Sequence, residues 1–245
     1  MSVAGLILAA GESRRMGFPK ALLRYRDETF LDTLIGLFAA RCQPVIVVLG
    51  AHAGLIREGT RRPATFATNA DYQRGQTSSM QCGLRAVPPT AESVLFTLVD
   101  HPAVAPATLD ALLAGPGPRD AAPSEDRSRP TGYPVAAPIG ATTVREWFPA
   151  TTNDCPATIP GGTAPLVHTP RPLVRVPRYQ GRRGHPIWFS RQLIAEFLDL
   201  PELGAARDIV RNRAAQTEFL DVDDAGILAD IDDAEAYGRL TGAPL

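Results

Sequence analysis

The sequence predicts an α/β fold in which a mostly parallel sheet carries helices on both faces. Short apolar runs of strand length alternate with longer segments whose apolar residues recur at helical spacing. This alternation is typical of parallel sheets that are covered on both sides. Apolar residues also make up 44% of the 245 residues, which is enough for a substantial core. We therefore expect a single three-layer domain over residues 1–245.

The elements of the first half follow from apolar runs and apolar stripes. The run 3–10 is too short for a typical helix and ends at Gly11, so it predicts a buried strand. The run 44–49 is a second such strand, and two more are predicted over residues 65–67 and 93–99. Apolar residues at intervals of three and four predict helices over residues 29–40, 77–86 and 106–114.

The second half begins with a change of composition. Residues 115 to about 163 are rich in Pro, Ala, Thr, Gly and Ser and poor in aliphatic residues, which predicts a flexible loop. It could shape a surface for a partner, or it could be sequence under no selection. Beyond it, strands are predicted over residues 172–176, 187–189 and 217–222, and helices over residues 191–200, 205–213 and 233–240.

Composition and charge exclude several classes of function. A formal net charge of -1 argues against nucleic acid as the main partner. The three cysteines form no Cys-x-x-Cys pair, so we expect neither a zinc site nor disulfides, and a cytoplasmic location. No apolar run is long enough to span a membrane, and no basic segment precedes the first apolar run as in a signal peptide.

The first predicted strand opens into a loop that carries three positive charges. Gly11 and Gly17 allow the backbone to turn sharply and to bring N–H groups close to a ligand. The cations are Arg14, Arg15 and Lys20. Backbone N–H groups combined with cations suit a polyphosphate. The spacing fits neither the Walker A pattern nor the dinucleotide-binding fingerprint. The alternative is a plain turn with surface arginines.

Two further segments carry candidate chemistry. Asp100 follows the strand predicted over 93–99, and ligands of open α/β sheets gather at the carboxyl ends of strands. Carboxylate oxygens suit Mg²⁺, so Asp100 is predicted to bind a divalent cation that bridges phosphate oxygens. The alternative is that Asp100 caps a helix. In the segment 181–186, Arg182, Arg183 and His185 could bind an anionic ligand, or they could form a solvated basic turn.

Several motifs, in order, resemble those of the MobA-like nucleotidyltransferases. They are Leu-Ala-Ala-Gly at 8–11 with Ser-Arg-Arg-Met-Gly at 13–17 and Pro-Lys at 19–20, Gly-x-x-x-Ser at 75–79, Asp-x-Pro at 100–102, and Gly-x-x-Gly-His-Pro at 181–186. Late motifs at 204–208 and 230–237 also match, although the second departs from the family pattern at Asp233, Ala234 and Ala236. Ala10 stands where guanylyltransferase relatives usually have glycine, so the sequence most resembles the molybdenum cofactor cytidylyltransferases.

The resemblance implies a GT-A-like nucleotidyltransferase fold, with a Rossmann-like sheet, and a role for each matching residue. It also implies that the loop predicted over residues 115–163 is an insertion. The implied catalytic residues are Arg15, Lys20 and Asp100. The implied nucleotide-binding residues are Ala9, Ala10, Gly11, Arg14, Asn69, Gly75, Ser78 and Ser79. Arg182, Arg183 and His185 are implied to bind the acceptor. Asp100 and Asp232 are the implied ligands of Mg²⁺ or Mn²⁺, although Asp230 is an alternative to Asp232, and Asp232 could instead cap the last helix.

The implied reaction transfers CMP from CTP to the terminal phosphate of molybdenum-molybdopterin and releases pyrophosphate. A molybdenum hydroxylase would be a partner that receives the cofactor. Two alternatives stay open at this point. One is a nucleotidyltransferase of the same fold that uses GTP or another small phosphate. The other is a non-catalytic carrier or insertion chaperone for the molybdenum cofactor. An oxidoreductase is disfavoured because the chain has no flavin or nicotinamide fingerprint.

Overall fold

The computed structural model describes residues 2–114, 171–201 and 204–242. The insertion predicted over residues 115–163 lies outside these residues. An eight-stranded sheet runs through the described part in the order β10-β7-β9-β6-β1-β4-β5, with β8 paired to β7. Its strands are β1 (Val3–Ala9), β4 (Val45–Leu49), β5 (Thr65–Thr68), β6 (Ser93–Leu98), β7 (Val174–Tyr179), β8 (Arg182–Arg183), β9 (Ile187–Ser190) and β10 (Thr217–Asp221).

Most strand pairs in the sheet are parallel. β1 pairs in parallel with β4 and β6, β4 with β5, and β7 with β10. β9 runs antiparallel to both β6 and β7. Because the direction reverses twice, β7 and β10 run in the same direction as β6. The carboxyl ends of all these strands except β8 and β9 therefore meet at one edge of the sheet.

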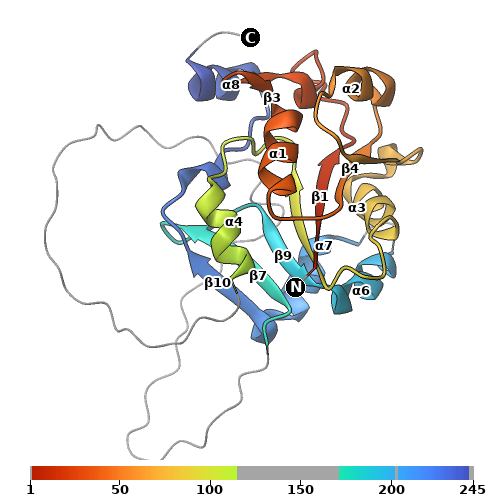
Figure 1. Ribbon diagram of the computed structural model, residues 1–245, viewed down its shortest axis with the longest axis vertical. Helices are drawn as coiled ribbons and strands as arrows, with labels where there is room; N and C mark the ends of the chain where they lie inside the picture. The colour runs from red at the N-terminus through yellow and green to blue at the C-terminus, as the bar shows by residue number, and fades with distance from the viewer. Residues whose placement is uncertain (1, 115–170, 202–203, 243–245) are drawn as a thin grey trace, which may run out of the picture.

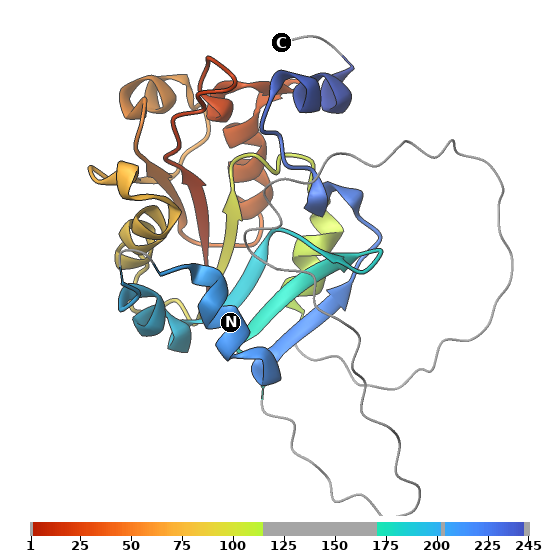
Figure 2. The ribbon, with the colours of Figure 1, turned by 180° about the vertical axis from the view of Figure 1, so that it is seen from behind.

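Helices cover both faces of the sheet, which confirms the predicted fold class. They are α1 (Phe30–Ala39), α2 (Ala53–Gly59), α3 (Gln76–Arg85), α4 (Pro106–Leu113), α6 (Ile194–Leu198), α7 (Ala206–Asn212) and α8 (Ala234–Thr241). α1 and α4 lie on one face (Figure 1), and α3, α6 and α7 lie on the other, which faces the viewer in Figure 2.

Two layers of core side chains follow from the alternation along β1. Val3, Ile7 and Ala9 pack into a cluster with α1 and α4, whereas Ala4, Leu6 and Leu8 pack into a second cluster with α3, α6 and α7. Successive strand side chains point to opposite faces, so a strand buried on both sides is apolar at every position. All seven residues of β1 are accordingly buried.

Nearly all of these elements were predicted within a few residues. The elements without a prediction are the small hairpin of β2 (Arg24–Tyr25) and β3 (Glu28–Thr29), the short strand β8, and α2. The helix predicted over residues 191–200 is wrong in detail, because it begins as a 3₁₀ turn over Arg191–Leu193 and continues as the short α6. Within the described part of the chain, no helix has the length and apolar character needed to cross a membrane.

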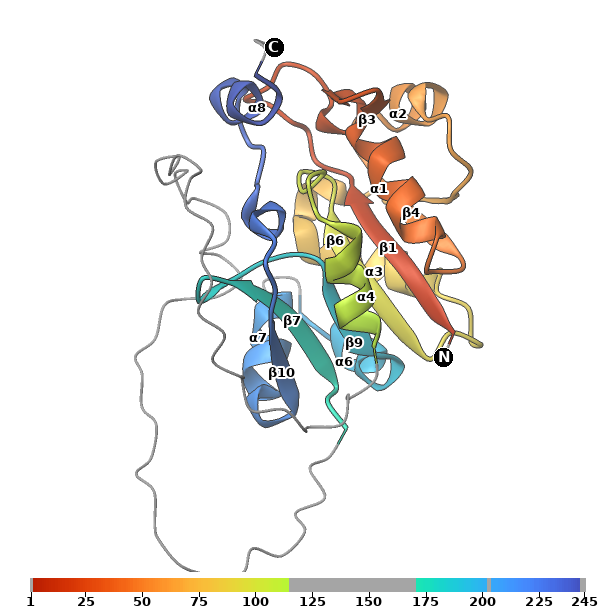
Figure 3. The ribbon, with the colours of Figure 1, turned by 60° about the vertical axis from the view of Figure 1, so that its left-hand side comes forward.

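The chain after β10 returns to the middle of the sheet before it ends. Figure 3 shows it rising from β10 toward α8. On the way, the backbone N–H of Ile231 donates to the carbonyl of Asp100 at 3.1 Å. The segment that precedes α8 is therefore attached to the end of β6, and this attachment positions the site described next.

Candidate active site

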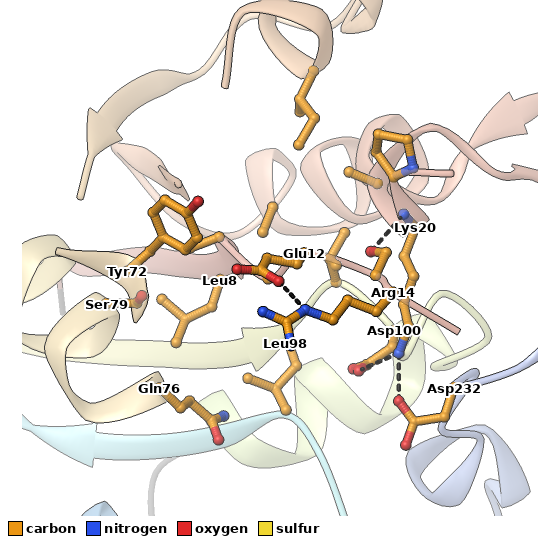
Figure 4. Close-up of a pocket in the computed structure, with 18 of the residues that line it drawn as sticks. Leu8, Glu12, Arg14, Lys20, Tyr72, Gln76, Ser79, Leu98, Asp100 and Asp232 are labelled. Carbon is orange, nitrogen blue, oxygen red and sulfur yellow. Dashed lines mark hydrogen bonds and ion pairs between the residues drawn. The ribbon is translucent and has the colours of Figure 1, made fainter. Parts of the chain in front are cut away.

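A pocket of about 550 Å³ opens at the carboxyl ends of β1 and β6. Its wall includes the end of β1 and the loop that follows it (residues 8–15), the turn around Lys20, the end of β6, and Asp232. Tyr72, Gln73, Gly75 and Gln76, before and at the start of α3, also line it. Figure 4 shows Tyr72, Gln76 and Ser79 on one side of the pocket and Lys20, Asp100 and Asp232 on the other. The pocket is therefore charged toward one end and carries neutral side chains toward the other.

The loop after β1 forms the wall that the sequence predicted. Of the predicted residues, Ala9, Ala10, Gly11, Arg14 and Arg15 all line the pocket. The left-handed positions of the loop are Ser13, with φ 53°, and Gly17, with φ 64°. Gly11 is not among the residues with positive φ. A Cβ added to Gly11 would meet nothing within 4 Å, so this glycine leaves open space where a ligand can approach the backbone.

Hydrogen bonds and an ion pair hold this loop in shape. The Oγ of Ser13 accepts from the backbone N–H of Lys20 at 3.0 Å, which joins the two ends of the loop. Arg14, whose side chain is largely exposed, pairs with Glu12. This internal ion pair offsets part of the positive charge that the sequence analysis assigned to the loop.

Three carboxylates gather opposite the loop. Asp100, Asp230 and Asp232 each offer an oxygen, and these atoms lie within 4.8 Å of one another. Lys20 bridges two of the three, because its Nζ contacts Oδ1 of Asp232 and lies 3.5 Å from Oδ2 of Asp100. Arg15 is more exposed, and its Nη1 lies 3.8 Å from Oδ2 of Asp232. The cationic loop and the acidic cluster thus meet at one end of the pocket.

The alternative roles of Asp100 and Asp232 as helix caps are not observed. The residue before α8 whose side chain caps the helix is Asp233, which accepts from the N–H of Ala236 at 2.8 Å. At the start of α4, the N–H of Ala105 donates instead to Asp224. The carboxylates of Asp100 and Asp232 are thus directed to Lys20 rather than to helix ends.

The ionisation of the cluster follows from burial and neighbouring charge. Burial opposes the charged form of Asp100, but the hydrogen bond with His101 and the electrostatic interactions with His101 and Lys20 outweigh it and lower the pKa of Asp100. For Lys20, burial is likewise outweighed by Asp100 and Asp232, which raise its pKa. Burial and the negative charge of Asp100 raise the pKa of Asp230 to about 7. The charged form of Asp230 is thus disfavoured next to Asp100, and a further positive charge in the cluster would stabilise it.

The donor set fits a divalent metal ion. Mg²⁺ and Mn²⁺ prefer oxygen ligands, and carboxylates from the end of a strand supply them. The Oδ1 atom of Asp230 is buried and, among the described residues, has no hydrogen-bond partner. A buried carboxylate oxygen without a partner is costly, and a bound cation would satisfy it. Asp100, Asp230 and Asp232 would hold such an ion.

The neutral end of the pocket contains only part of the predicted nucleotide-binding set. Gly75 and Ser79 line the pocket, whereas Asn69 and Ser78 are not part of its wall. Asn69 is buried, and its Nδ2 donates to the Oγ atoms of Ser78 and Ser79 at 3.0 and 3.1 Å. In this conformation Asn69 orients the start of α3. A direct contact between Asn69 or Ser78 and a nucleotide stays a prediction.

The predicted acceptor-binding residues lie away from the pocket wall. Arg182 and Arg183 form β8, and the guanidinium of Arg183 lies 4.3 Å from the centre of the Phe219 ring. His185 is buried, with its ring 4.8 Å from that of His101. Burial, together with the electrostatic interaction with the neighbouring His101 ring, lowers the pKa of His185 to about 3, so the ring of His185 is neutral near pH 7. The acceptor role of these residues stays a prediction.

Tyr72 and Gln76 also line the neutral end of the pocket. Tyr72 was not predicted, whereas Gln76 lies inside the predicted Gly-x-x-x-Ser segment but was not given a role of its own. No simple pattern marks them, because their position depends on how the loop before α3 folds over the end of β4. The amino-acid composition gives one indication that Lys20 has a special role. It is the only lysine among the 25 Lys and Arg residues of the chain. Every other basic side chain is an arginine.

A cationic loop faces clustered carboxylates at the carboxyl edge of a mostly parallel sheet, which is the edge where open α/β proteins bind their ligands. The chain belongs to the family of MobA-like NTP transferase domains, because the model of that family matches residues 5–218. This finding confirms the family resemblance seen in the motifs. Asp230 and Asp232 lie beyond the matched region.

Individual relatives agree with this assignment. A protein of Mycobacterium avium (strain 104) described as a probable molybdenum cofactor guanylyltransferase is 33% identical over 116 residues. The match spans 46% of this chain and 57% of that protein, so the chain covers little more than half the length of this relative.

Solved structures resemble this one over nearly the whole chain. The crystal structure of Rv0371c from Mycobacterium tuberculosis H37Rv is 25% identical with a TM-score of 0.66, and the match covers 99% of this chain and 98% of that one. A complex of Rv0371c with manganese is 23% identical with a TM-score of 0.64, over 99% and 100% of the two chains. The second similarity shows that the fold is shared.

Proposed function

We propose that this chain is a nucleotidyltransferase that depends on a divalent metal ion and acts in molybdenum cofactor biosynthesis. It would transfer CMP from CTP to the terminal phosphate of molybdenum-molybdopterin. The observation that carries the proposal is the meeting of Lys20 with Asp100 and Asp232 at the end of a pocket walled by the loop after β1. Family membership supports the same chemistry.

The pocket supplies what nucleotidyl transfer requires. The backbone of residues 10–15 and the side chains of Arg15 and Lys20 would hold the triphosphate and neutralise the leaving pyrophosphate. Asp100, Asp230 and Asp232 would hold Mg²⁺ or Mn²⁺, which supplies positive charge to the phosphate oxygens when it is bound. Rv0371c, which shares the fold, has been solved as a complex with manganese, and this supports a divalent metal ion here.

The reaction then needs no covalent intermediate on the protein. An oxygen of the acceptor phosphate forms a bond to the α-phosphorus of the nucleotide, while the bond from that phosphorus to the bridging oxygen of the β-phosphate breaks. Pyrophosphate leaves with the bonding electrons. The acceptor phosphate is already ionised near pH 7 and needs no general base. The protein contributes position and charge.

GTP is a second candidate for the nucleotide. Ala10 supports CTP, because it stands where guanylyltransferase relatives usually have glycine. The description of the Mycobacterium avium relative supports GTP. The two candidates share the phosphate end of the pocket and differ only in the base that the other end accepts.

An assay with each nucleotide tests this proposal. The purified chain, Mg²⁺ and molybdenum-molybdopterin are mixed with CTP, GTP, ATP or UTP, and the release of pyrophosphate is measured. Release with CTP well above GTP is the expected result. The reverse preference would replace the cytidylyl assignment by a guanylyl one. No release with any nucleotide would overturn the proposal of an enzyme.

A carrier or insertion chaperone is separated from an enzyme by one substitution. Asp100→Asn removes a negative charge from the cluster and keeps the size of the side chain. Transfer is expected to collapse in this variant. If the chain serves only as a carrier, delivery of the cofactor to a molybdenum hydroxylase would survive the change.

A further inference from the structure

His101 lies directly behind the acidic cluster and is not part of the pocket wall. Its Nδ1 forms a hydrogen bond of 2.8 Å with Oδ1 of Asp100. Oδ2, the other oxygen of this carboxylate, lies 3.5 Å from Nζ of Lys20. The two oxygens of Asp100 thus have different neighbours, one behind the site and one within it.

Neighbouring groups hold His101 from its far side. Its ring packs 4.8 Å from the ring of His185, which in turn lies 5.6 Å from the ring of Phe96. The backbone N–H of His185 donates to the carbonyl of Ile227 at 3.0 Å. Rings packed in this way leave His101 little room to rotate away from Asp100.

The polar interactions of His101 are directed to Asp100. The side chain is 2% exposed, and its Nε2 is buried without a hydrogen-bond partner among the described residues. Burying a ring nitrogen without a partner costs free energy, so an apolar residue of similar size would serve packing alone at least as well. A histidine at this position therefore points to a role in orienting Asp100.

We propose that His101 is a positioning residue that fixes the carboxylate of Asp100 in the orientation that binds the metal ion. This inference rests on the proposed function, because it concerns the same metal site. Groups behind a metal ligand restrict its rotation, and their loss typically weakens metal affinity by about 10- to 100-fold. His101 acts through Asp100 and does not touch the substrate.

Two substitutions separate positioning from packing. His101→Asn keeps an N–H donor near the place of Nδ1, because the amide nitrogen of asparagine stands at a similar distance from the backbone. His101→Leu keeps apolar bulk but removes the donor. His52→Asn is the matched control, since His52 is exposed and its left-handed φ of 57° suits asparagine.

The measurement is a titration of the free protein with Mn²⁺ alone, in which unbound Mn²⁺ is followed by electron paramagnetic resonance. We expect His101→Leu to weaken Mn²⁺ binding by about ten-fold or more. His101→Asn should keep the native affinity within about three-fold, and His52→Asn should leave it unchanged. Circular dichroism and thermal unfolding establish that each variant is folded.

The outcomes test two claims, which are the positioning role of His101 and the presence of a metal site. Equal binding by the native chain and a folded His101→Leu variant would overturn the positioning role, as would equal weakening in His101→Leu and a folded His101→Asn. A His101→Leu variant that does not fold leaves the decision to His101→Asn, whose native-like affinity supports the role and whose loss of affinity opposes it. If the native chain binds no Mn²⁺, the metal site of the proposed function fails, and the inference fails with it.

Discussion

Lys20 joins parts of the chain that are far apart in sequence. It contacts Asp100 and Asp232, which lie 80 and 212 positions away, and its side chain is only 13% exposed. An ammonium group is a compact charge, whereas a guanidinium is a broad planar fork. The space between the two carboxylates suits the smaller group, and the chain has arginine at every other basic position.

Lys20→Arg is therefore expected to be nearly as impaired in catalysis as a variant that has no charged group at this position. Lys20→Met should reduce kcat for pyrophosphate release by about 10²- to 10³-fold, the usual cost of removing one charge-stabilising donor. Lys20→Arg should restore less than about one tenth of the kcat that is lost in Lys20→Met, because the guanidinium does not fit between the carboxylates. Arg24→Met, a change to an exposed cation, is the control. Native kcat in Lys20→Arg would contradict the argument.

At the scale of elements, the fit between α3 and the sheet depends on Gly83. A Cβ added to Gly83 would contact Cδ1 of Leu6 and come within 2.6 Å of Cγ2 of Val48. Both side chains are fully buried and cannot move aside freely. The helix therefore lies close to β1 and β4 because this position has no side chain.

Gly83→Ala is expected to destabilise the fold. Alanine favours a helix over glycine by up to about 1 kcal/mol, but overpacking a buried contact costs about 1–3 kcal/mol. We expect the free energy of unfolding in urea to fall by about 1 kcal/mol or more. Gly54→Ala in α2 is the matched control, because its added Cβ would meet nothing within 4 Å. Equal stability gains in both variants would contradict the close packing of α3.

α8 anchors the segment that carries the late carboxylates. The hydroxyl of Tyr237 donates to the carbonyl of Arg24 at 3.0 Å, and its ring lies 6.1 Å from that of Phe30. These contacts attach α8 to the hairpin of β2 and β3, close to Lys20 in sequence. Asp232 stands two residues before α8, so the position of the helix affects the position of this carboxylate.

Tyr237→Phe should loosen this attachment without disturbing the core. Loss of one hydrogen bond is expected to lower the free energy of unfolding by about 0.5–1.5 kcal/mol. The Mg²⁺ concentration that gives half-maximal pyrophosphate release should rise as well, because Asp232 becomes less well held. Tyr25→Phe is the control, since no hydrogen bond of its hydroxyl holds α8. If the Mg²⁺ concentration for half-maximal release does not change, the attachment of α8 has no effect on the metal site.

At the scale of the whole molecule, one sheet combines the two halves of the chain. β9, from the second half, pairs with β6, from the first, along Ser93–Phe96. Trp188 of β9 packs in the same cluster as α1 and α4. Both core clusters contain residues from both halves of the chain, so we propose that the described residues unfold as one cooperative unit.

Unfolding in urea tests this proposal. In a Trp147→Phe background, Trp188 is the only tryptophan, and its fluorescence reports on β9. Far-UV circular dichroism reports on all the helices and strands. The midpoints from the two signals are expected to coincide, as they do for a two-state transition. Separate midpoints would divide the chain into two independently stable units.

Local sequence signals explain which parts of the structure could be predicted. The strand 3–10 is a run of small and apolar residues, and the strand 93–99 is apolar except at Ser93 and Thr97. Arg15 and Lys20 lie in the loop after the first strand and Asp100 directly follows the second, so their meeting at one edge was predictable. α2 contains two glycines and few apolar residues, so its sequence shows no apolar stripe that would predict a helix. The position of Asp230 depends on the crossing of the chain at Ile231, which no local pattern encodes.

The burial of the only lysine among acidic side chains has a practical consequence. Reductive methylation with ¹³C-formaldehyde modifies amines, so the chain can carry a single labelled side chain in addition to its terminal amine. The methyl resonances of that side chain would lie at the point where nucleotide and metal are proposed to meet. Their chemical shifts would then report on the binding of metal and of nucleotide next to Lys20, with each added separately.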